Sequence, residues 1–264
     1  MQHSNSAYRI HAIKAMSDNY IWAICQHNQA VIVDPGVADG VLEFLTQNQL
    51  DLTAILITHH HDDHIGGVAA LKQHYPNLTL YAQKNHNVLA DVWVDEGSQF
   101  AVLGLDFAVW RTAGHTDTHI SYLCQIDGRT QVFCGDTLFY GGCGRVFTGT
   151  IDELYDSMMR YATLADDTLF YPAHEYTLSN LRFALTVATI PQQQAIKTSI
   201  EKVEQKLATD GCSLPTTLAE QKQVNVFLQV ADTSFATHLQ QKYALPDGEP
   251  RRLFALLRTL KNQA

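Results

Sequence analysis

Residues 58–64 read Thr-His-His-His-Asp-Asp-His, and the interpretation of the whole chain starts from this stretch. It contains the pattern His-x-His-x-Asp-His, formed by His59, His61, Asp63 and His64. In an extended loop alternate residues point the same way, so His59, His61 and Asp63 can converge while His64 turns to the other side. Imidazole nitrogens and carboxylates suit zinc, iron or manganese. One loop can therefore contribute ligands to two neighbouring metal ions.

The residues on either side of this loop are typical of a strand–loop–helix unit. Residues 52–57 form a continuous apolar run, which fits a strand buried on both faces. Residues 65–74 read as a helix that stops before Pro76, and Gly66-Gly67 lets the backbone pack closely behind the histidines. The polar cluster thus follows the carboxyl end of a buried strand, where α/β folds usually build their sites.

Patterns elsewhere indicate a β-rich first part and a helical last part. Strands are expected at 21–25, 30–33, 78–82, 100–112, 121–126, 131–134 and 168–171, and helices at 37–47 and 150–165. After about residue 178 strand signals are absent, and helices are expected at 191–208, from Thr217 with its capping-box partner Glu220, at 232–243 and at 250–263. We therefore expect an α/β catalytic domain in residues 1–177 and an all-helical domain in residues 178–264.

The composition is that of a folded chain in a reducing compartment. A length of 264 residues suits one large domain or a main domain with a smaller partner, and 46% hydrophobic residues can form a packed core. The net charge of -9 argues against nucleic acid as a partner. Five scattered cysteines without a CxxC pair are typical of reduced thiols. No segment approaches the roughly 20 apolar residues of a membrane span, and no signal-peptide core precedes Tyr20. We expect a cytoplasmic protein without a membrane partner.

A single loop cannot complete two metal sites, and later turns contain suitable residues. His115 follows the strand expected to end near residue 112, and Asp136 follows the strand that ends at Cys134. His174 comes soon after the strand at 168–171. Each lies just beyond an expected strand end, where it can complete a metal site.

At this point the sequence resembles the metallo-β-lactamase superfamily and, within it, the glyoxalase II (hydroxyacylglutathione hydrolase) family, over nearly the whole chain. The pattern His-x-His-x-Asp-His carries the first resemblance. The second rests on Gly141-Gly142-Cys143-Gly144-Arg145, His174-Glu175-Tyr176 and Arg258-x-x-Lys261. The resemblance implies an αββα sandwich followed by a helical substrate-binding domain.

The resemblance also implies a role for each matching residue. Two divalent metal ions are expected, zinc first, with iron or manganese as alternatives. The first ion would be bound by His59, His61 and His115, the second by Asp63, His64 and His174, with Asp136 and a hydroxide bridging them. The substrate would be bound by Arg145, Tyr176, Arg258 and Lys261. We expect His119 and Glu175 to support the ligands rather than to bind metal.

The implied reaction is hydrolysis of the thioester S-(R)-lactoylglutathione to glutathione and (R)-lactate, the second step of methylglyoxal detoxification. Because a thiol has a pKa of about 8.5, a thiolate leaves with little protonation, and a thioester needs no dedicated general acid. Two positions depart from the family pattern: Phe147 stands where a Tyr is common, and Gln229 where an Arg is common. One hydroxyl contact and one cationic contact are therefore in doubt.

Other hydrolases share this metal loop. A lactonase or β-lactamase gives no reason for the Arg258 and Lys261 pair, and a nuclease would need a basic surface. A persulfide dioxygenase would use part of the ligand set, and flavodiiron proteins commonly have Glu in place of His61. A non-catalytic, metal-stabilised binding protein is the alternative of a different class. A measurement of metal content would distinguish it from the hydrolase, because absence of bound metal would favour the binding protein. We expect a monomer.

Overall fold

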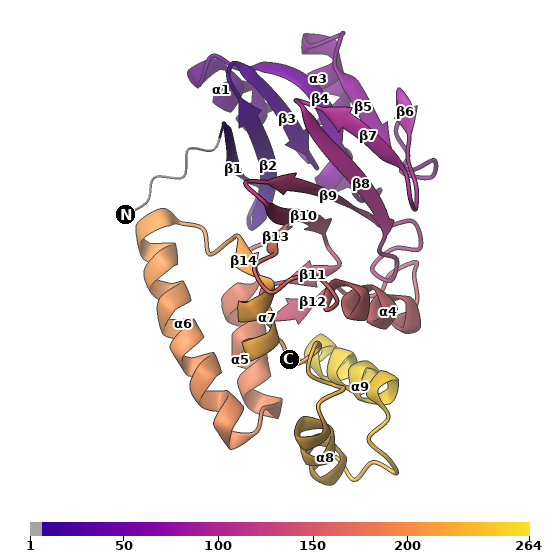
Figure 1. The fold of residues 1–264 in the computed structure, drawn as a ribbon, viewed down its shortest axis with the longest axis vertical. Coiled ribbons are helices and arrows are strands. Elements are labelled where there is room, and N and C mark those ends of the chain that lie inside the picture. The colour runs from indigo at the N-terminus through magenta and orange to yellow at the C-terminus, as the bar shows by residue number, and fades with distance from the viewer. Residues whose placement is uncertain (1–6) are drawn as a thin grey trace. The chain divides into compact units, whose positions relative to one another are not determined.

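The computed structural model describes residues 7–264 and divides into two compact units (Figure 1). The first unit consists of Met1–Arg111 and Thr118–Gly135, and the second of Thr112–Asp117 and Asp136–Ala264. Residues 1–6, where the predicted catalytic domain begins, lie outside the described residues. The predicted domain boundary between residues 177 and 178 stays a prediction.

Among the residues that the structure describes, the first unit contains a mixed sheet of six strands. Its strands, in spatial order, are β1 (Tyr8–Ala15), β2 (Asn19–Gln26), β3 (Gln29–Val33), β4 (Asp51–Leu56), β5 (Thr79–Ala82) and β6 (Val92–Trp93). The first three strands are antiparallel, whereas β3, β4, β5 and β6 are parallel. Val33 pairs with Leu56, so the residues that follow β3 and β4 leave the sheet at the same edge.

Four antiparallel strands form the facing layer of this unit. They are β7 (Gln99–Val102), β8 (Leu105–Arg111), β9 (Ile120–Ile126) and β10 (Arg129–Gly135). Phe100 stacks on Tyr81 of the first sheet at 4.1 Å between ring centroids. The buried Tyr122 hydroxyl donates to the Ile57 carbonyl at 2.9 Å, which satisfies its polar group inside the apolar core. The two sheets therefore share one core.

Helices cover the other face of the first sheet. These are α1 (Asp39–Gln47) and α3 (Val68–His74). The short α2 (Asp62–Ile65) directly precedes α3. Val41 and Leu45 of α1 join Val68 and Leu71 of α3 in a cluster with the buried side chains of the strands. The spacing of these apolar residues by three and four positions places them on one side of each helix.

The second unit is mainly helical. Its elements are β11 (Leu138–Phe139), β12 (Gly142–Cys143), α4 (Ile151–Tyr161), β13 (Leu169–Pro172), α5 (Thr177–Val187), α6 (Ile190–Asp210), β14 (Thr216–Thr217), α7 (Leu218–Val224), α8 (Thr233–Lys242) and α9 (Pro250–Asn262). The predicted capping box is present at α7, where the Thr217 side chain accepts from the Glu220 N–H. A second capping box begins α4 at Thr150.

The predicted fold class, an α/β sandwich with a helical C-terminal part, is confirmed. Several elements differ from expectation, and β1, β6, β11, β12 and α2 are among those absent from the prediction. Strand β14 pairs antiparallel with β13, although no strand is expected after residue 178. A two-residue strand is too short to produce an alternating pattern. Helix α5 is absent from the prediction, because its buried face includes Thr177 and Asn180, which interrupt the apolar stripe.

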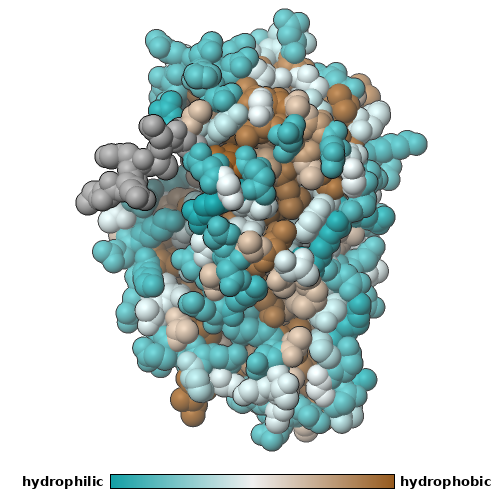
Figure 2. Space-filling view, viewed as in Figure 1, coloured by the Kyte–Doolittle hydropathy of each residue, from teal (hydrophilic) through white to brown (hydrophobic). Residues whose placement is uncertain are grey.

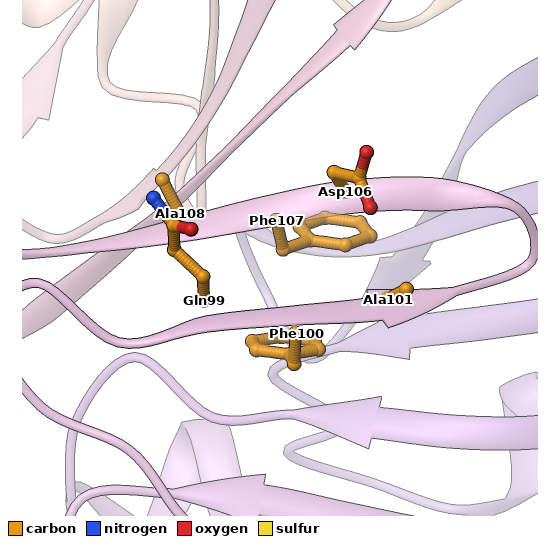
Figure 3. Close-up of a pocket in the computed structure, with 6 residues that line it drawn as sticks. All are labelled: Gln99, Phe100, Ala101, Asp106, Phe107 and Ala108. Atoms are coloured by element: carbon orange, nitrogen blue, oxygen red, sulfur yellow. The ribbon is translucent and has the colours of Figure 1, made fainter.

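The surface outside the predicted site shows ordinary features. Hydrophilic residues cover much of the face drawn in Figure 2, with apolar residues among them, as is usual for a folded protein. Figure 3 shows a hollow on the β7–β8 hairpin that is lined by Gln99, Phe100, Ala101, Asp106, Phe107 and Ala108. None of these is a predicted site residue. Within residues 7–264, no helix is long and apolar enough to cross a membrane.

We predict that Gly36→Ala destabilises the protein, because an added Cβ would lie 1.9 Å from the Asp63 carbonyl oxygen. The backbone would have to move, at a cost of about 1–3 kcal/mol in the free energy of unfolding. Urea denaturation measures this loss.

Gly40→Ala is the matched control. Its Cβ would meet its nearest neighbour, in the Ile13 side chain, at 3.6 Å, which is an ordinary contact. Because Gly40 lies in α1, alanine should raise stability by about 0.5–1 kcal/mol. Equal stability of Gly36→Ala and wild type would contradict the close approach of the two loops.

Candidate metal centre

The histidine-rich loop leaves the sheet directly after β4. Thr58 and His59 are fully buried, whereas His61 and Asp63 are partly exposed. The prediction of an extended loop through Asp63 is wrong, because α2 begins at Asp62 and His61 is its N-cap. Acidic residues in the first turn favour a helix at this point, since they face the positive end of the helix dipole. Asp63 and His64 therefore stand on a helical turn.

This turn places His64 beside His59 rather than on the other side of the loop. The two ring centroids are 4.0 Å apart. His59 Nε2 and His61 Nδ1 lie 3.0 Å apart, and His64 Nε2 lies 3.6 Å from Asp63 Oδ2. The four predicted ligands of the first unit thus point their nitrogen and oxygen atoms at one another in pairs.

Asp34 holds this arrangement from the neighbouring strand end. It follows β3, is 4% exposed and has a positive φ of 53°. Its carboxylate accepts the Thr58 N–H and the Thr58 hydroxyl, both at 2.7 Å. Its Oδ2 also lies 3.0 Å from His64 Nδ1. This contact places the Asp34 carboxylate against the Nδ1 side of the His64 ring.

Two further side chains support ligands of the same unit. Asn19 of β2 donates to Asp63 Oδ2 at 2.9 Å. The His119 ring is fully buried and stacks on His59, with centroids 5.0 Å apart and planes at 26°. Sequence reasoning expected this kind of role for His119 but missed Asp34 and Asn19. The sequence feature that could have identified Asp34 is its position directly after the strand expected at residues 30–33.

The second unit contributes the remaining three predicted ligands. His115 precedes β9, Asp136 follows β10, and His174 follows β13. All three are buried, with exposures of 4%, 6% and 4%. Asp136 Oδ2 lies 3.5 Å from His115 Nε2 and 3.3 Å from His174 Nε2. One carboxylate oxygen therefore stands between two imidazoles, as a bridging ligand would.

Neighbouring groups orient these two imidazoles. The Nδ1 atom of His115 lies at 2.8 Å from the Arg145 carbonyl oxygen, so it is the protonated nitrogen and Nε2 is left for a metal. The Tyr176 ring stacks on His174 at 4.8 Å with an interplanar angle of 3°. Glu175 accepts from the Ser213 N–H at 2.8 Å and from its hydroxyl at 2.7 Å, and Ser213 is not among the residues predicted from the sequence.

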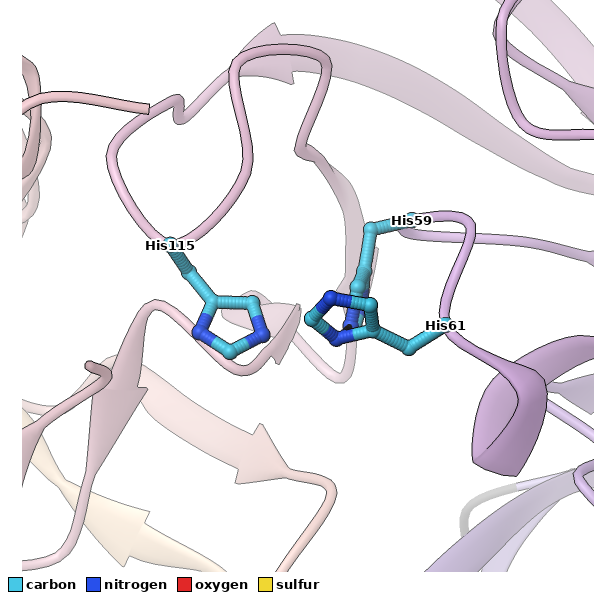
Figure 4. Close-up of side chains that lie close together, drawn as sticks. All are labelled: His59, His61 and His115. Atoms are coloured by element: carbon cyan, nitrogen blue, oxygen red, sulfur yellow. Dashed lines mark hydrogen bonds between the residues drawn. The ribbon is translucent and has the colours of Figure 1, made fainter. Parts of the chain in front are cut away.

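The donor set within each unit fits a metal ion. Two atoms bound to one tetrahedral zinc at roughly 2.0–2.1 Å are about 3.3 Å apart. The ligand pairs His59–His61, His115–Asp136 and His174–Asp136 have separations of 3.0, 3.5 and 3.3 Å. Candidate metal-binding groups include all the predicted ligands: His59, His61, Asp63, His64, His115, Asp136 and His174. Figure 4 shows His59 and His61 on the loop after β4, and His115 on the loop that precedes β9. The clusters indicate a dinuclear site for divalent metal.

The predicted substrate-binding residues all belong to the second unit. Arg145 is exposed, and the Lys261 ammonium donates to the Ser179 hydroxyl at 2.8 Å. Arg258 is 5% exposed and donates to the Cys143 carbonyl at 2.7 Å. Burial lowers the pKa of Lys261, and the positive charges of Arg258 and Arg145 lower it further. The positive charges of Arg258 and Arg145 therefore act on Lys261.

Comparison with protein families assigns both parts of the chain. A family model described as the metallo-beta-lactamase superfamily matches residues 17–174, and one described as hydroxyacylglutathione hydrolase C-terminus matches residues 175–264. The hydroxyacylglutathione hydrolase of Aeromonas salmonicida is 46% identical over 260 residues, covering 97% of this chain and 99% of the relative. That of Neisseria meningitidis serogroup C is 44% identical over 259 residues, covering 97% and 98%.

Solved structures agree with this fold. The crystal structure of ETHE1 from Myxococcus xanthus is similar with a TM-score of 0.64 and 30% identity, over 96% of this chain and 97% of that one. The BLEG-1 B3 metallo-beta-lactamase is similar with a TM-score of 0.63 and 20% identity, over 84% and 99%. The second likeness shows the fold alone.

We predict that Asp34→Asn destabilises the protein and weakens metal binding. The amide has the shape of the carboxylate but lacks its charge and one acceptor oxygen, so one of the two hydrogen bonds from Thr58 and the charged contact with His64 are lost. Hydrogen bonds to a buried charge contribute about 1.5–3 kcal/mol, and the free energy of unfolding should fall by that amount. Urea denaturation and zinc analysis measure both effects.

Asp62→Asn is the control, since Asp62 is exposed and lies beside the same ligands. Stability should stay within about 0.5 kcal/mol of wild type. Parallel behaviour of the two variants would mean that Asp34 has no special part in holding the loop.

Proposed function

Since the chain belongs to the hydroxyacylglutathione hydrolase family of the metallo-β-lactamase superfamily, we propose that it hydrolyses S-(R)-lactoylglutathione to glutathione and (R)-lactate. The relatives carry the name of this activity and are matched over nearly their full length. The single observation that carries the proposal within this chain is the set of side chains that the second unit brings together. It combines His115, Asp136 and His174 with a cluster of cations.

The metal ligands are proposed to come from both units. His59, His61 and His115 would hold one ion, and Asp63, His64 and His174 the other, with Asp136 shared. The ligand-like spacings inside each unit support this assignment. Zinc is the proposed metal because imidazole and carboxylate in such spacing suit tetrahedral coordination, and iron or manganese would accept the same ligands.

The bound metals would supply a Lewis acid and hydroxide at neutral pH, because metal coordination lowers the pKa of water to around 7. The residues of this chain would do the rest. The Arg145 carbonyl keeps the proton of His115 on Nδ1, so that its Nε2 atom can coordinate, and the Asp34 carboxylate lies 3.0 Å from His64 Nδ1. A thiolate needs little protonation to leave, so no acidic side chain is required at the leaving group.

Recognition of glutathione is proposed to depend on the cations of the second unit. Glutathione conjugates carry two carboxylates, and arginine and lysine bind carboxylates through charge-assisted hydrogen bonds. Arg145 and Lys261 are proposed to bind the carboxylates directly, whereas Arg258, whose Nη1 donates to the Cys143 carbonyl, adds its positive charge to the same cluster. Bringing such cations together is costly unless an anion offsets them. Tyr176, stacked on His174, could offer its hydroxyl to the peptide portion. Phe147 lies edge-on to His115 with centroids 5.1 Å apart, and its exposed ring can only pack against the substrate.

We also propose that the protein is a cytoplasmic monomer. All five cysteines are thiols, which suits a reducing compartment. The net charge of -9 disfavours nucleic acid as a partner.

We predict that zinc-loaded wild type hydrolyses S-(R)-lactoylglutathione and that Lys261→Ala and Arg145→Ala raise KM with little change in kcat. Each lost charge-assisted bond contributes about 1.5–3 kcal/mol, which corresponds to a rise of about 10-fold to 100-fold. Loss of thioester absorbance measures the rates. An effect confined to KM indicates lost binding that is common to substrate and transition state.

Lys222→Ala is the matched control. Lys222 lies in the same helical region but is paired with Asp166 at 2.7 Å on the exposed surface, so its loss should leave both constants unchanged. An inactive wild type that carries two metals per chain would refute the substrate while keeping the metal assignment. An inactive wild type without metal would favour a binding protein.

The pH dependence of KM gives a separate prediction. Because the pKa of Lys261 lies below the ordinary lysine value of 10.5, its charge is lost at a lower pH than that of an exposed lysine. KM should therefore rise on the alkaline side before pH 10.5 is reached. Lys261→Arg, which stays protonated, should lack this rise. Identical alkaline profiles for both proteins would show that Lys261 does not bind the substrate in its charged form.

A further inference from the structure

Arg258 has an unusual position for a charged residue of a C-terminal helix. It lies on α9 but is only 5% exposed, whereas the adjacent Thr259 is exposed. Its Nη1 donates to the Cys143 carbonyl at 2.7 Å and to the Gly144 carbonyl at 3.3 Å. The guanidinium is therefore directed into the loop that follows β12.

This loop is in direct contact with a predicted metal ligand. His115 Nδ1 lies 2.8 Å from the Arg145 carbonyl, and the Phe147 N–H donates to the His115 carbonyl at 2.9 Å. A Cβ on Gly144 would lie 2.0 Å from the Asp136 carbonyl oxygen and 3.2 Å from His115 Nδ1. The loop therefore packs against both His115 and Asp136, and a shift of it would displace both.

A second set of hydrogen bonds connects the helical segment to the residue next to His174. Ser213 lies after α6, is 2% exposed and donates twice to the Glu175 carboxylate, at 2.7 and 2.8 Å. Glu175 follows His174 directly in the chain. Lys206 of α6 holds the same segment by donating to the Ser213 carbonyl at 3.0 Å. The segment after α6 thus holds the Glu175 side chain, which stands next to His174 in the chain.

We propose that the helical segment α5–α9 sets the geometry of His115, Asp136 and His174, with Arg258 and Ser213 as its positioning residues. The inference rests on the proposed metal-ligand set. Arg258 acts on the loop that orients His115, and Ser213 acts on the residue beside His174. Arg258 contacts the backbone of the loop beside His115, and Ser213 contacts the Glu175 carboxylate, so both act on the ligands through neighbouring residues.

The chemistry of the two sets of hydrogen bonds explains why these residue types are needed. The Arg258 guanidinium donates from Nη1 to two carbonyl oxygens of the loop and from Nε to Asn262 Oδ1 at 3.1 Å, so two of its nitrogens fix its plane. A lysine ammonium has one nitrogen and cannot occupy both positions. Serine supplies a backbone N–H and a hydroxyl that together match both oxygens of Glu175. The two sets of hydrogen bonds act on different histidines, so they should affect different metal ions.

The test measures zinc affinity of the full chain by competition with a chromophoric chelator. Wild type should bind two ions, and Arg258→Ala and Ser213→Ala should each bind one of them roughly 10-fold more weakly, the effect typical of lost outer contacts. Arg258→Lys should show a smaller loss. Thr259→Ala and Thr209→Ala, which are exposed neighbours on α9 and α6, should match wild type.

Activity distinguishes positioning from substrate binding. Arg258→Lys and Ser213→Ala should lower kcat, whereas Lys261→Ala should raise KM. Wild-type zinc affinity in Arg258→Ala and Ser213→Ala would overturn the proposal. If the alanine variants lose their far-ultraviolet circular dichroism, Arg258→Lys decides: a wild-type fold with weakened zinc binding supports the proposal, and wild-type affinity overturns it. A wild type that binds no zinc would instead refute the proposed function itself.

Discussion

The Asp34 carboxylate is the buried charge around which the first half of the metal centre is arranged. It accepts two hydrogen bonds from Thr58 and lies 3.0 Å from His64 Nδ1. A buried carboxylate is costly unless its oxygens are satisfied, so the Thr58 backbone and the His64 ring are both held in place. These contacts are possible because β3 and β4 are parallel neighbours and leave the sheet at one edge.

The same principle recurs in the second unit with different groups. There a backbone carbonyl orients His115, and Asp136 stands between two imidazoles. Each unit therefore presents nitrogen and oxygen atoms whose orientation is already set by neighbours that do not bind metal. Such support is what keeps ligands in coordination geometry, and its loss typically weakens metal binding about 10-fold to 100-fold.

The helical segment combines two tasks that the sequence alone does not separate. Lys261 is half-buried near other cations, which suits an anionic substrate. Arg258, three residues earlier, donates hydrogen bonds from its Nη1 to the carbonyls of Cys143 and Gly144. Two basic residues on one helix face can thus serve different purposes, one toward the substrate and the other toward the loop beside His115.

The sequence by itself determined the residue types of the metal centre, the alternation of strands and the helical C-terminal part. Metal-ligand spacing within residues 58–64 and the positions of His115, Asp136 and His174 after strand ends are local features, and local patterns can be read directly. Long helices such as α6 and α9 also repeat their apolar residues often enough to be recognised.

Only the tertiary structure decided which groups orient those ligands. Asp34, Asn19 and Ser213 lie 24, 44 and 38 residues from the residues they contact, and no local pattern pairs them. The helical turn at Asp62–Ile65 and the two-residue strand β14 were likewise missed, because each is too short to show a period. The exposure of Arg258 depends on the loop above it, so its burial could not be predicted from a basic residue near the chain end. Residue chemistry is carried by sequence, whereas the partners of a buried polar group are set by which distant segments the fold brings together.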